Sequence, residues 1–216
     1  YVILNTAQDH KRAYDGDKGP NTGGMGAYSP TPLSTDDIME KTKSTIIEPT
    51  LKAMRDVGHP FVGFLYVGLM VVDGEPFVIE FNVRMGDPET QVVLPLLETS
   101  LFELLWNATH GKIKDSTVKI SQKTAVTVVL AAEGYPNSYP KGMEISGLED
   151  DGLVFHAGTK KVDDKMVTCG GRVLNVVGFG NDLKSAIDDA YRIVEGVNFE
   201  GKFYRKDIGQ KGLNRD

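Results

Sequence analysis

The chain has 216 residues, of which 40% are hydrophobic and 25% charged, a composition typical of a soluble globular protein with one large or two small domains. A formal net charge of −6 argues against a nucleic-acid partner, because phosphate backbones are bound by clustered lysines and arginines. The single cysteine, Cys169, excludes an internal disulfide and favours a reducing compartment, and no apolar run is long enough to span a bilayer. We therefore expect a cytoplasmic protein without membrane contact.

The chain opens with strand-forming residues, which predict a strand over residues 2–8. A strand this close to the first residue, with no initiator methionine, indicates that the sequence begins inside a domain, and we expect a fragment. A long loop then runs to Pro30 and contains Asn21-Thr22-Gly23-Gly24-Met25-Gly26. Loops of this length inside a compact domain are usually functional or disordered.

Glycines in this loop would let backbone N–H groups approach an anion closely, as in phosphate-binding nests. Lys11 and Arg12, just before the loop, are candidate phosphate-binding cations, whereas His10 is more typical of a hydrogen-bonded structural residue. Two simpler interpretations stay open, because the glycines are also typical of a flexible connector and the two cations of solvated surface charge.

Residues 34–57 predict helical scaffold. Ser34-Thr35-Asp36-Asp37 has the chemistry of a helix start, and Pro49 predicts a kink or two consecutive helices. An apolar run over residues 61–72 predicts a strand, and Asp73-Gly74 predicts a hairpin that joins it to another strand beginning at Phe77.

The strand after this hairpin, Phe77-Val78-Ile79-Glu80-Phe81-Asn82-Val83-Arg84, carries the most informative pattern in the chain. Alternation predicts a core-facing side made of Phe77, Ile79, Phe81 and Val83, with Val78 and the three polar residues on the other side. Carboxylate and amide oxygens are ligands that Mg²⁺ accepts, and a guanidinium matches a phosphate. Because the strand then breaks at Gly86-Asp87-Pro88, the pattern predicts a metal–phosphate site at its end. An ordinary half-buried antiparallel strand shows the same alternation.

The second half of the chain predicts a different architecture. A capping box at Ser100 begins a helix that ends at Gly111, with Trp106 on its core side, and the polar residues 112–123 indicate a boundary. Strand-like runs over residues 124–132, 153–157 and 172–178, with a helix from Asn181 to Gly196, predict a small β-rich domain with one packed helix. Gly170-Gly171-Arg172 presents a cation beside exposed backbone N–H groups, which suits a ribose phosphate and is equally typical of a tight turn.

Several strings resemble known proteins. Glu80-Phe81-Asn82-Val83-Arg84 resembles the Glu-x-Asn-x-Arg strand of ATP-grasp ligases. Arg84-Met85-Gly86-Asp87-Pro88-Glu89-Thr90-Gln91 resembles the signature of the phosphoribosylamine–glycine ligase (glycinamide ribonucleotide synthetase) family, with Met85 where leucine or phenylalanine is usual. Further strings resemble the same family in order along the chain, at residues 8–12, 19–30, 156–160, 168–173 and 204–209.

The resemblance implies an α+β fold, with the C-terminal part of an ATP-grasp domain (antiparallel sheet with helices) over residues 1–112. Residues 113–216 would form the family's β-rich C-terminal domain. It also implies a ligase of de novo purine biosynthesis that joins glycine to 5-phosphoribosylamine through a glycyl phosphate, with ATP and Mg²⁺ (or Mn²⁺) as cofactors.

The family's functional residues carry over onto matching positions. Glu80 and Asn82 would bind the metal, Arg84 would steady the transferring phosphoryl group, and Asp87 would receive a substrate ammonium; the last two are the implied catalytic residues. The residues implied in substrate binding are Lys11, Arg12, Asn21, Thr22, Gly23, Gly24, Met25, Gly26, Pro88, Glu89, Thr90, Gln91, Gly170, Gly171 and Arg172.

One departure leaves the number of metals open. Many ATP-grasp enzymes carry a second acidic ligand on the neighbouring strand, whereas Val67, Gly68 or Leu69 stands opposite Glu80 here. The family's amino-terminal domain and the front of its ATP site also have no counterpart in this sequence. We therefore expect the isolated chain to turn over poorly or not at all without that missing N-terminal part of the protein.

Two alternatives stay open. One is another ATP-grasp carboxylate–amine or carboxylating ligase that shares Glu-x-Asn-x-Arg. The other is a non-catalytic fragment that binds a phosphoribosyl ligand.

Overall fold

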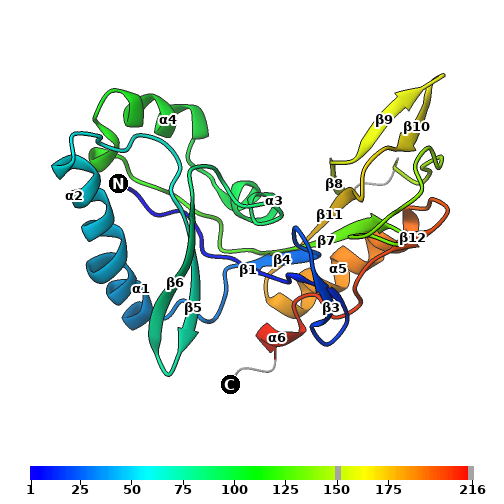
Figure 1. Cartoon of the computed structure of the whole chain (residues 1–216), viewed down its shortest axis with the longest axis horizontal. Helices are drawn as coiled ribbons and strands as arrows, with labels where there is room; N and C mark the ends of the chain where they lie inside the picture. The colour runs from blue at the N-terminus through cyan, green and yellow to red at the C-terminus, as the bar shows by residue number, and fades with distance from the viewer. Residues whose placement is uncertain (149–151, 214–216) are drawn as a thin grey trace. The chain divides into compact units, whose positions relative to one another are not determined.

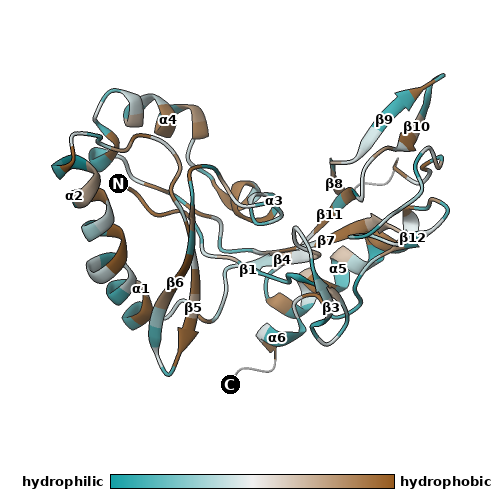
Figure 2. Cartoon of the chain, in the orientation of Figure 1, coloured by the Kyte–Doolittle hydropathy of each residue, from teal (hydrophilic) through white to brown (hydrophobic). Residues whose placement is uncertain are grey.

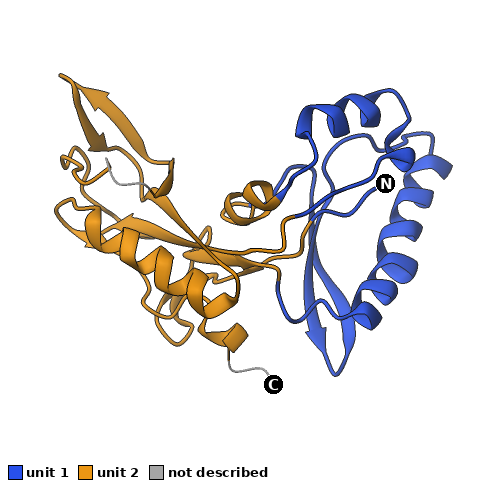
Figure 3. Cartoon of the chain, turned by 180° about the vertical axis from the view of Figure 1, so that it is seen from behind, with its two compact units in different colours: residues 1–4, 31–86, 97–120 blue, residues 5–30, 87–96, 121–216 orange. Residues whose placement is uncertain are grey.

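The computed structural model describes residues 1–148 and 152–213, and the chain forms two compact units, each described here by itself (Figure 3). The first unit comprises Tyr1–Leu4, Thr31–Gly86 and Leu97–Ile120, and the second comprises Asn5–Pro30, Asp87–Leu96 and Ser121–Asp216. Each unit therefore interleaves three segments. The predicted domains, 1–112 and 113–216, are contiguous, and that division stays a prediction. The glycine-rich loop and the segment Asp87–Leu96 share a unit with the C-terminal part of the chain.

The second unit is built on an antiparallel sheet with the strand order β1-β4-β7-β11-β8, and β12 pairs with β7 (Figure 1). Its strands are β1 (Gln8–Asp9), β4 (Gly26–Ser29), β7 (Thr124–Ala132), β8 (Leu153–His156), β11 (Arg172–Gly180) and β12 (Lys202–Phe203). The β7 and β11 strands are rich in valine and are buried along most of their length, because they occupy the middle of the sheet. The three strands predicted after residue 123 are confirmed.

Helix α5 (Leu183–Gly196) packs on β7 and β11 (Figure 1). Its N-cap is Asp182, one residue later than predicted, and the side chain of this residue accepts the Ser185 N–H at 2.7 Å. A Cβ on Gly178 of β11 would lie 2.1 Å from the backbone nitrogen of Ala190, so the helix and the strand approach as closely as two backbones can. The predicted β-rich domain with one packed helix is confirmed. The buried residues of the helix are Ala186, Ile187, Ala190, Ile193 and Val194.

Short elements complete the second unit. They are the hairpin β2 (Arg12–Tyr14) with β3 (Lys18–Asn21), the hairpin β9 (Thr159–Val162) with β10 (Lys165–Thr168), α3 (Thr90–Val93), a 3-10 turn over Leu94–Leu96, and α6 (Gln210–Leu213). The predicted strand over residues 2–8 is wrong for most of its length. Only Gln8, with Asp9 after it, pairs with β4, because the residues before it have no ladder partner in the described chain.

The first unit combines helices with a two-stranded ribbon. Helix α1 (Asp36–Thr42), a π-helical turn (Lys43–Ile47) and α2 (Glu48–Asp56) follow one another, which fits the two consecutive helices predicted from Pro49. The ribbon pairs β5 (Tyr66–Val72) with β6 (Glu75–Asn82) through a turn in which Asp73 and Gly74 have positive φ, so the predicted hairpin is confirmed. Helix α4 (Leu101–Thr109) and a 3-10 turn (Ile113–Asp115) complete the unit. No helix of the described residues combines the length and hydropathy of a membrane span.

The two faces of the ribbon differ from the alternation that the sequence predicts. Gly68 pairs with Glu80, but the next residue of β5 pairs with Val78, so Ile79 is an extra residue in a β-bulge. Since directly paired residues point to the same face, Phe77 shares the face of Glu80 and the valine does not. The predicted assignment of Phe77 and Val78 to faces is therefore wrong.

Hydrophobic side chains of the first unit are largely exposed. Figure 2 shows hydrophobic colouring along β5, β6 and α4. Ile79 and Val83, predicted to face a core, are 62% and 76% exposed. Trp106, also predicted to be in the core, is 55% exposed and stacks on Phe102 and His110, with ring centroids 6.1 and 4.2 Å away. These predictions are wrong: although α1 contacts β6, the described residues leave Ile79, Val83 and Trp106 more than half exposed.

Candidate functional site

Glu80 and Asn82 lie on one face of the β5–β6 ribbon in the first unit. Across the ribbon they pair with Gly68 and Tyr66. A Cβ on Gly68 would lie 3.0 Å from the Cγ atom of Glu80, so the glycine leaves room for the glutamate side chain to lie across β5. The neighbouring strand therefore contributes space rather than a second carboxylate.

The Glu80–Asn82 pair fits the ligand chemistry of Mg²⁺. One carboxylate and one amide oxygen, two residues apart on a strand, are hard donors, and Mg²⁺ takes only one or two carboxylates from protein. In the described part of the chain no group of three or more histidine, cysteine, aspartate or glutamate residues is arranged to hold a metal ion. The pair matches a cation that completes its coordination with phosphate and water oxygens.

Arg84 lies beyond the end of the strand. The β6 strand ends at Asn82, so the predicted pleated arrangement of three polar groups is wrong for the arginine. Its Nη1 atom donates to the Met85 carbonyl at 2.8 Å, and this local bond holds the side chain just after β6, at the end of the ribbon opposite the Asp73–Gly74 turn. The guanidinium is placed by the bend after β6.

In the second unit, Arg172 at the start of β11 joins two segments that the sequence singles out. Its Nη2 atom forms an ion pair with the Asp87 Oδ2 atom at 2.8 Å, and its Nη1 atom donates to the Gly23 carbonyl at 2.8 Å. Nη1 also lies 3.2 Å from the Asp87 carbonyl. Three predicted site residues therefore meet at the Arg172 guanidinium, namely Gly23, Asp87 and Arg172 itself. Gly23 and Arg172 are 149 positions apart in the sequence.

The glycines of the loop are required by close packing. A Cβ on Gly23 would lie 2.9 Å from the Arg172 Cζ atom, and a Cβ on Gly24 would lie 2.3 Å from the Pro88 Cδ atom. Gly24 also has φ +115°, a region that other residues rarely adopt. Glycine at both positions therefore lets the loop lie directly against Arg172 and Pro88, and the requirement is stricter at Gly24.

The N–H groups of this loop already have protein acceptors. Those of Gly23, Gly24 and Met25 donate to the Tyr135 hydroxyl (3.0 Å), the Thr22 Oγ1 atom (2.9 Å) and the His10 carbonyl (2.8 Å). The predicted phosphate-binding nest is therefore wrong for these three groups. The loop is packed and hydrogen-bonded, exposed at Asn21 and Gly23 and buried from Gly24 to Gly26.

Tyr135 is a site residue that the sequence did not reveal. Its hydroxyl accepts the Gly23 N–H, and its ring lies against Gly171, where a Cβ would be 2.3 Å from the Tyr135 Cδ2 atom. The Gly170 N–H donates to the Gly158 carbonyl at 3.1 Å and so is not the exposed donor that was predicted. The Tyr-Pro-Asn-Ser string indicated only a turn, because a partner 112 residues away leaves no local signal.

The predicted phosphate-binding cations before the loop have partners of their own. The Lys11 ammonium lies 2.5 Å from the Asp9 carboxylate, and the Arg12 Nη1 atom donates to the Gly19 carbonyl at 2.7 Å. Asn21 pairs with Arg12 between β2 and β3. The two Arg12 contacts connect the strands of the hairpin, the Lys11–Asp9 pair lies just before it, and any phosphate would compete with these contacts.

The segment from Pro88 to Gln91 leads into α3 and supports Asp87. Gln91 donates through Nε2 to the Asp87 Oδ1 atom at 3.2 Å, so both carboxylate oxygens of Asp87 accept a hydrogen bond. Glu89 is buried. Burial, together with the charge of Glu89, raises the pKa of Asp9, while Lys11 opposes this shift. The sequence-predicted residues thus fall into two groups, with Glu80, Asn82 and Arg84 in the first unit and all the others in the second.

Two protein-family models cover most of the chain and nearly all of the predicted site residues. Residues 1–90 match the model for the phosphoribosylglycinamide synthetase ATP-grasp (A) domain, and residues 125–211 match the model for the phosphoribosylglycinamide synthetase C domain. The chain belongs to the phosphoribosylglycinamide synthetase family. The predicted family and the α+β fold with an ATP-grasp part are thereby confirmed.

Individual relatives agree with the family models. The chain is 50% identical to the phosphoribosylamine–glycine ligase of Leptospira interrogans over 99% of its own length and 51% of that protein. It is 50% identical to the trifunctional purine biosynthetic protein adenosine-3 of Gallus gallus over 96% of the chain and 21% of that protein. The crystal structure of phosphoribosylamine–glycine ligase from Thermotoga maritima matches with a TM-score of 0.89 and 44% identity, covering 96% of this chain and 52% of that one. The chain spans about half the length of the two bacterial relatives.

Proposed function

We propose that the protein containing this chain is an ATP-dependent ligase of de novo purine biosynthesis. It joins glycine to 5-phosphoribosylamine and releases glycinamide ribonucleotide, ADP and phosphate in the cytoplasm. The observation that carries this proposal is the match of both family models, in order, along one chain. The oxygen pair of Glu80 and Asn82 and the Arg172–Asp87 ion pair supply groups that such a reaction needs.

The reaction has two steps. A glycine carboxylate oxygen attacks the γ-phosphorus of ATP, which gives glycyl phosphate and ADP. The amine of 5-phosphoribosylamine then attacks the glycyl carbonyl carbon, and inorganic phosphate leaves with the glycine oxygen. Both steps concentrate negative charge around phosphoryl oxygens, so fixed positive charge lowers the barrier most.

The residues of this chain divide that work. Glu80 and Asn82 hold Mg²⁺ (or Mn²⁺), which when bound neutralises phosphate charge. Arg84 exchanges its bond to the Met85 carbonyl for a phosphoryl oxygen, since a guanidinium suits an anion better than a neutral carbonyl. The half-exposed carboxylate of Asp87 receives the substrate ammonium, and the loop beside Arg172 binds the phosphoribosyl part.

The test replaces Glu80 in the full-length protein. Glu80→Gln keeps the size of the side chain but removes the charge that binds metal, and we expect turnover to fall at least about a hundredfold, because a bound metal supplies several kcal/mol of transition-state stabilisation. The matched control is Glu75→Gln on the same strand and the same face, where the carboxylate pairs with Lys41. Equal turnover of the two variants would refute the assignment, and a non-catalytic protein would show no dependence on either change.

A second assay addresses the length of the chain and the choice of substrate. We propose that the 216-residue polypeptide releases ADP poorly by itself and needs the part of the protein that its longer relatives contain. The assay measures ADP release with glycine or with bicarbonate, with and without the remaining half of the Leptospira relative. Rapid glycine-dependent turnover by the chain alone contradicts the first expectation, and bicarbonate-dependent turnover supports a carboxylating ligase instead.

A further inference from the structure

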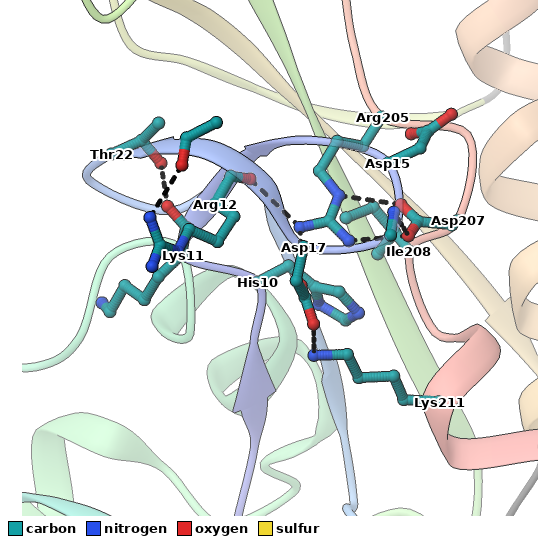
Figure 4. Close-up of polar contacts among 12 residues, drawn as sticks. His10, Lys11, Arg12, Asp15, Asp17, Thr22, Arg205, Asp207, Ile208 and Lys211 are labelled. Carbon is teal, nitrogen blue, oxygen red and sulfur yellow. Dashed lines mark hydrogen bonds and ion pairs between the residues drawn. The ribbon is translucent and has the colours of Figure 1, made fainter.

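Arg205 is a completely buried arginine in the second unit, and its guanidinium forms a bidentate ion pair (Figure 4). The Nε and Nη2 atoms donate to the two carboxylate oxygens of Asp207, each at 2.7 Å. Burying a charged group costs several kcal/mol even after relaxation. For packing alone, an apolar residue of the same volume would stabilise the fold more. The charge therefore needs a different explanation.

The remaining donor of Arg205 reaches the β2–β3 hairpin. Nη1 donates to the Arg12 carbonyl at 3.0 Å and to the Asp17 Oδ1 atom at 3.1 Å, across 193 and 188 positions of the sequence. The Asp207 Oδ2 atom accepts the Gly16 N–H at 2.8 Å as well. One guanidinium and its carboxylate partner thus hold the first strand and the turn of the hairpin.

The neighbours of Arg205 add to this attachment. The Lys206 N–H donates to the Asp15 Oδ1 atom at 2.8 Å, and the Lys211 ammonium forms an ion pair with Asp17. We call residues 204–211 the C-terminal clamp. Figure 4 shows Arg205, Asp207 and Lys211 of the clamp directed toward the hairpin side chains and carbonyls.

The hairpin in turn holds the glycine-rich loop. Arg12 pairs with Asn21 at the base of the hairpin. The N–H and Oγ1 groups of Thr22 donate to the Lys11 carbonyl at 2.8 and 2.9 Å, and the same Oγ1 atom accepts the Gly24 N–H at 2.9 Å. Contacts therefore run without a gap from Arg205 through the hairpin to the loop that touches Arg172.

We propose that Arg205 is a positioning residue: through the β2–β3 hairpin it sets the glycine-rich loop, residues 21–26, against Arg172 and so controls affinity for the phosphoribosyl substrate. The statement about affinity rests on the function proposed above. The statement about the loop does not, because the contacts that carry it lie within the second unit.

The test compares Arg205→Lys and Arg205→Met with the control Lys206→Met, which removes an adjacent cation whose side chain is exposed. Amide hydrogen exchange is followed by mass spectrometry in the full-length protein. Peptides covering residues 19–26 are expected to exchange about tenfold faster in Arg205→Met, which corresponds to one lost charge-assisted hydrogen bond, while peptides from β7 stay unchanged. Arg205→Lys is expected to restore part of the protection, and Lys206→Met to match the wild type.

Kinetics give the second measurement. In Arg205→Met we expect KM for 5-phosphoribosylamine to rise about tenfold, with KM for ATP and kcat within about twofold of wild type. Faster exchange that is equal in all peptides, or KM values that rise together, would show a purely structural role and overturn the proposal. If the wild type shows no ligase activity, the function fails, and the exchange data still decide whether the clamp sets the loop.

A milder variant guards against misfolding. Asp17→Asn removes one charged acceptor of Arg205 on the more exposed side of the network. Faster exchange confined to residues 12–26 supports the clamp, and unchanged exchange there contradicts it.

Discussion

The β5–β6 ribbon and the β7–β11 pair are both antiparallel, yet they place functional groups in different ways. The β7 and β11 strands are buried in the middle of a sheet under α5, and Arg172 stands where β11 begins. In the ribbon, most residues of β6 are exposed, and Glu80 lies across a glycine of the partner strand. The candidate site residues of the second unit are therefore held by close backbone packing, whereas those of the ribbon are side chains on a largely exposed strand.

We expect the largest difference between the sheet and the ribbon when a glycine in each is replaced by alanine. In Gly178→Ala the new Cβ would meet the α5 backbone at 2.1 Å, so the helix must shift. We expect a loss of about 3 kcal/mol in the free energy of unfolding, the upper end for overpacking. In Gly68→Ala the methyl group is closest to the flexible Glu80 side chain at 3.0 Å, and its contacts with the Tyr66 ring at 3.4 Å and the Glu80 carbonyl at 3.5 Å are ordinary. We therefore expect a stability change below about 1 kcal/mol with weakened metal binding.

Urea unfolding measures the first effect, and Mn²⁺ titration measures the second. Equal losses of stability in the two alanine variants would contradict this difference between the sheet and the ribbon. Wild-type affinity of Gly68→Ala for Mn²⁺ would contradict it as well.

We expect acid to destabilise the second unit through protonation of His10. Burial, with the charges of Arg205 and Lys211, lowers the pKa of His10 to about 4, while Asp207 and Asp17 oppose this shift. Between pH 6.5 and 4 the unfolded chain binds a proton that the folded chain does not, so stability falls as the pH falls through this window. The full effect is roughly 3 kcal/mol, from the value of one pKa unit.

The measurement is the free energy of unfolding of wild type and His10→Gln from pH 7.5 to 4. Subtracting the two curves cancels other groups that titrate in the same window, such as Asp9. Parallel curves would contradict the burial of a neutral imidazole.

A smaller effect is expected at Tyr135. Tyr135→Phe removes the hydroxyl that accepts the Gly23 N–H, and we expect a loss of about 1 kcal/mol, the net value of one hydrogen bond. Tyr139→Phe is the matched control, because both rings lie against Gly171 while the Tyr139 hydroxyl has no hydrogen bond among the described residues. Chemical denaturation measures both variants, and equal losses would show that the hydroxyl does not hold the loop.

The sequence predicts the elements of the second unit well because their signals are local. Uninterrupted apolar runs mark β7 and β11, and an Asn-Asp start followed by a 3.6-residue stripe marks α5. It fails on the ribbon faces, since one extra residue at Ile79 changes which side chains share a face without changing composition.

In the candidate site, too, the sequence identifies the residues that stand in a local pattern and misses those that do not. Glu80, Asn82, Gly23, Asp87 and Arg172 stand in strings that resemble one family, and the family itself is confirmed. Tyr135 and Arg205 were not identified, because their partners in the loop and the hairpin lie more than a hundred residues away and no spacing rule connects them.

In the proposed function the glycine carboxylate is activated as an acyl phosphate. Glycine labelled with ¹⁸O in both carboxylate oxygens tests it directly in the full-length protein, with ATP and 5-phosphoribosylamine as the other substrates. We expect one labelled oxygen to appear in the inorganic phosphate for each turnover and the other to stay in the amide of the product. Unlabelled phosphate would contradict it.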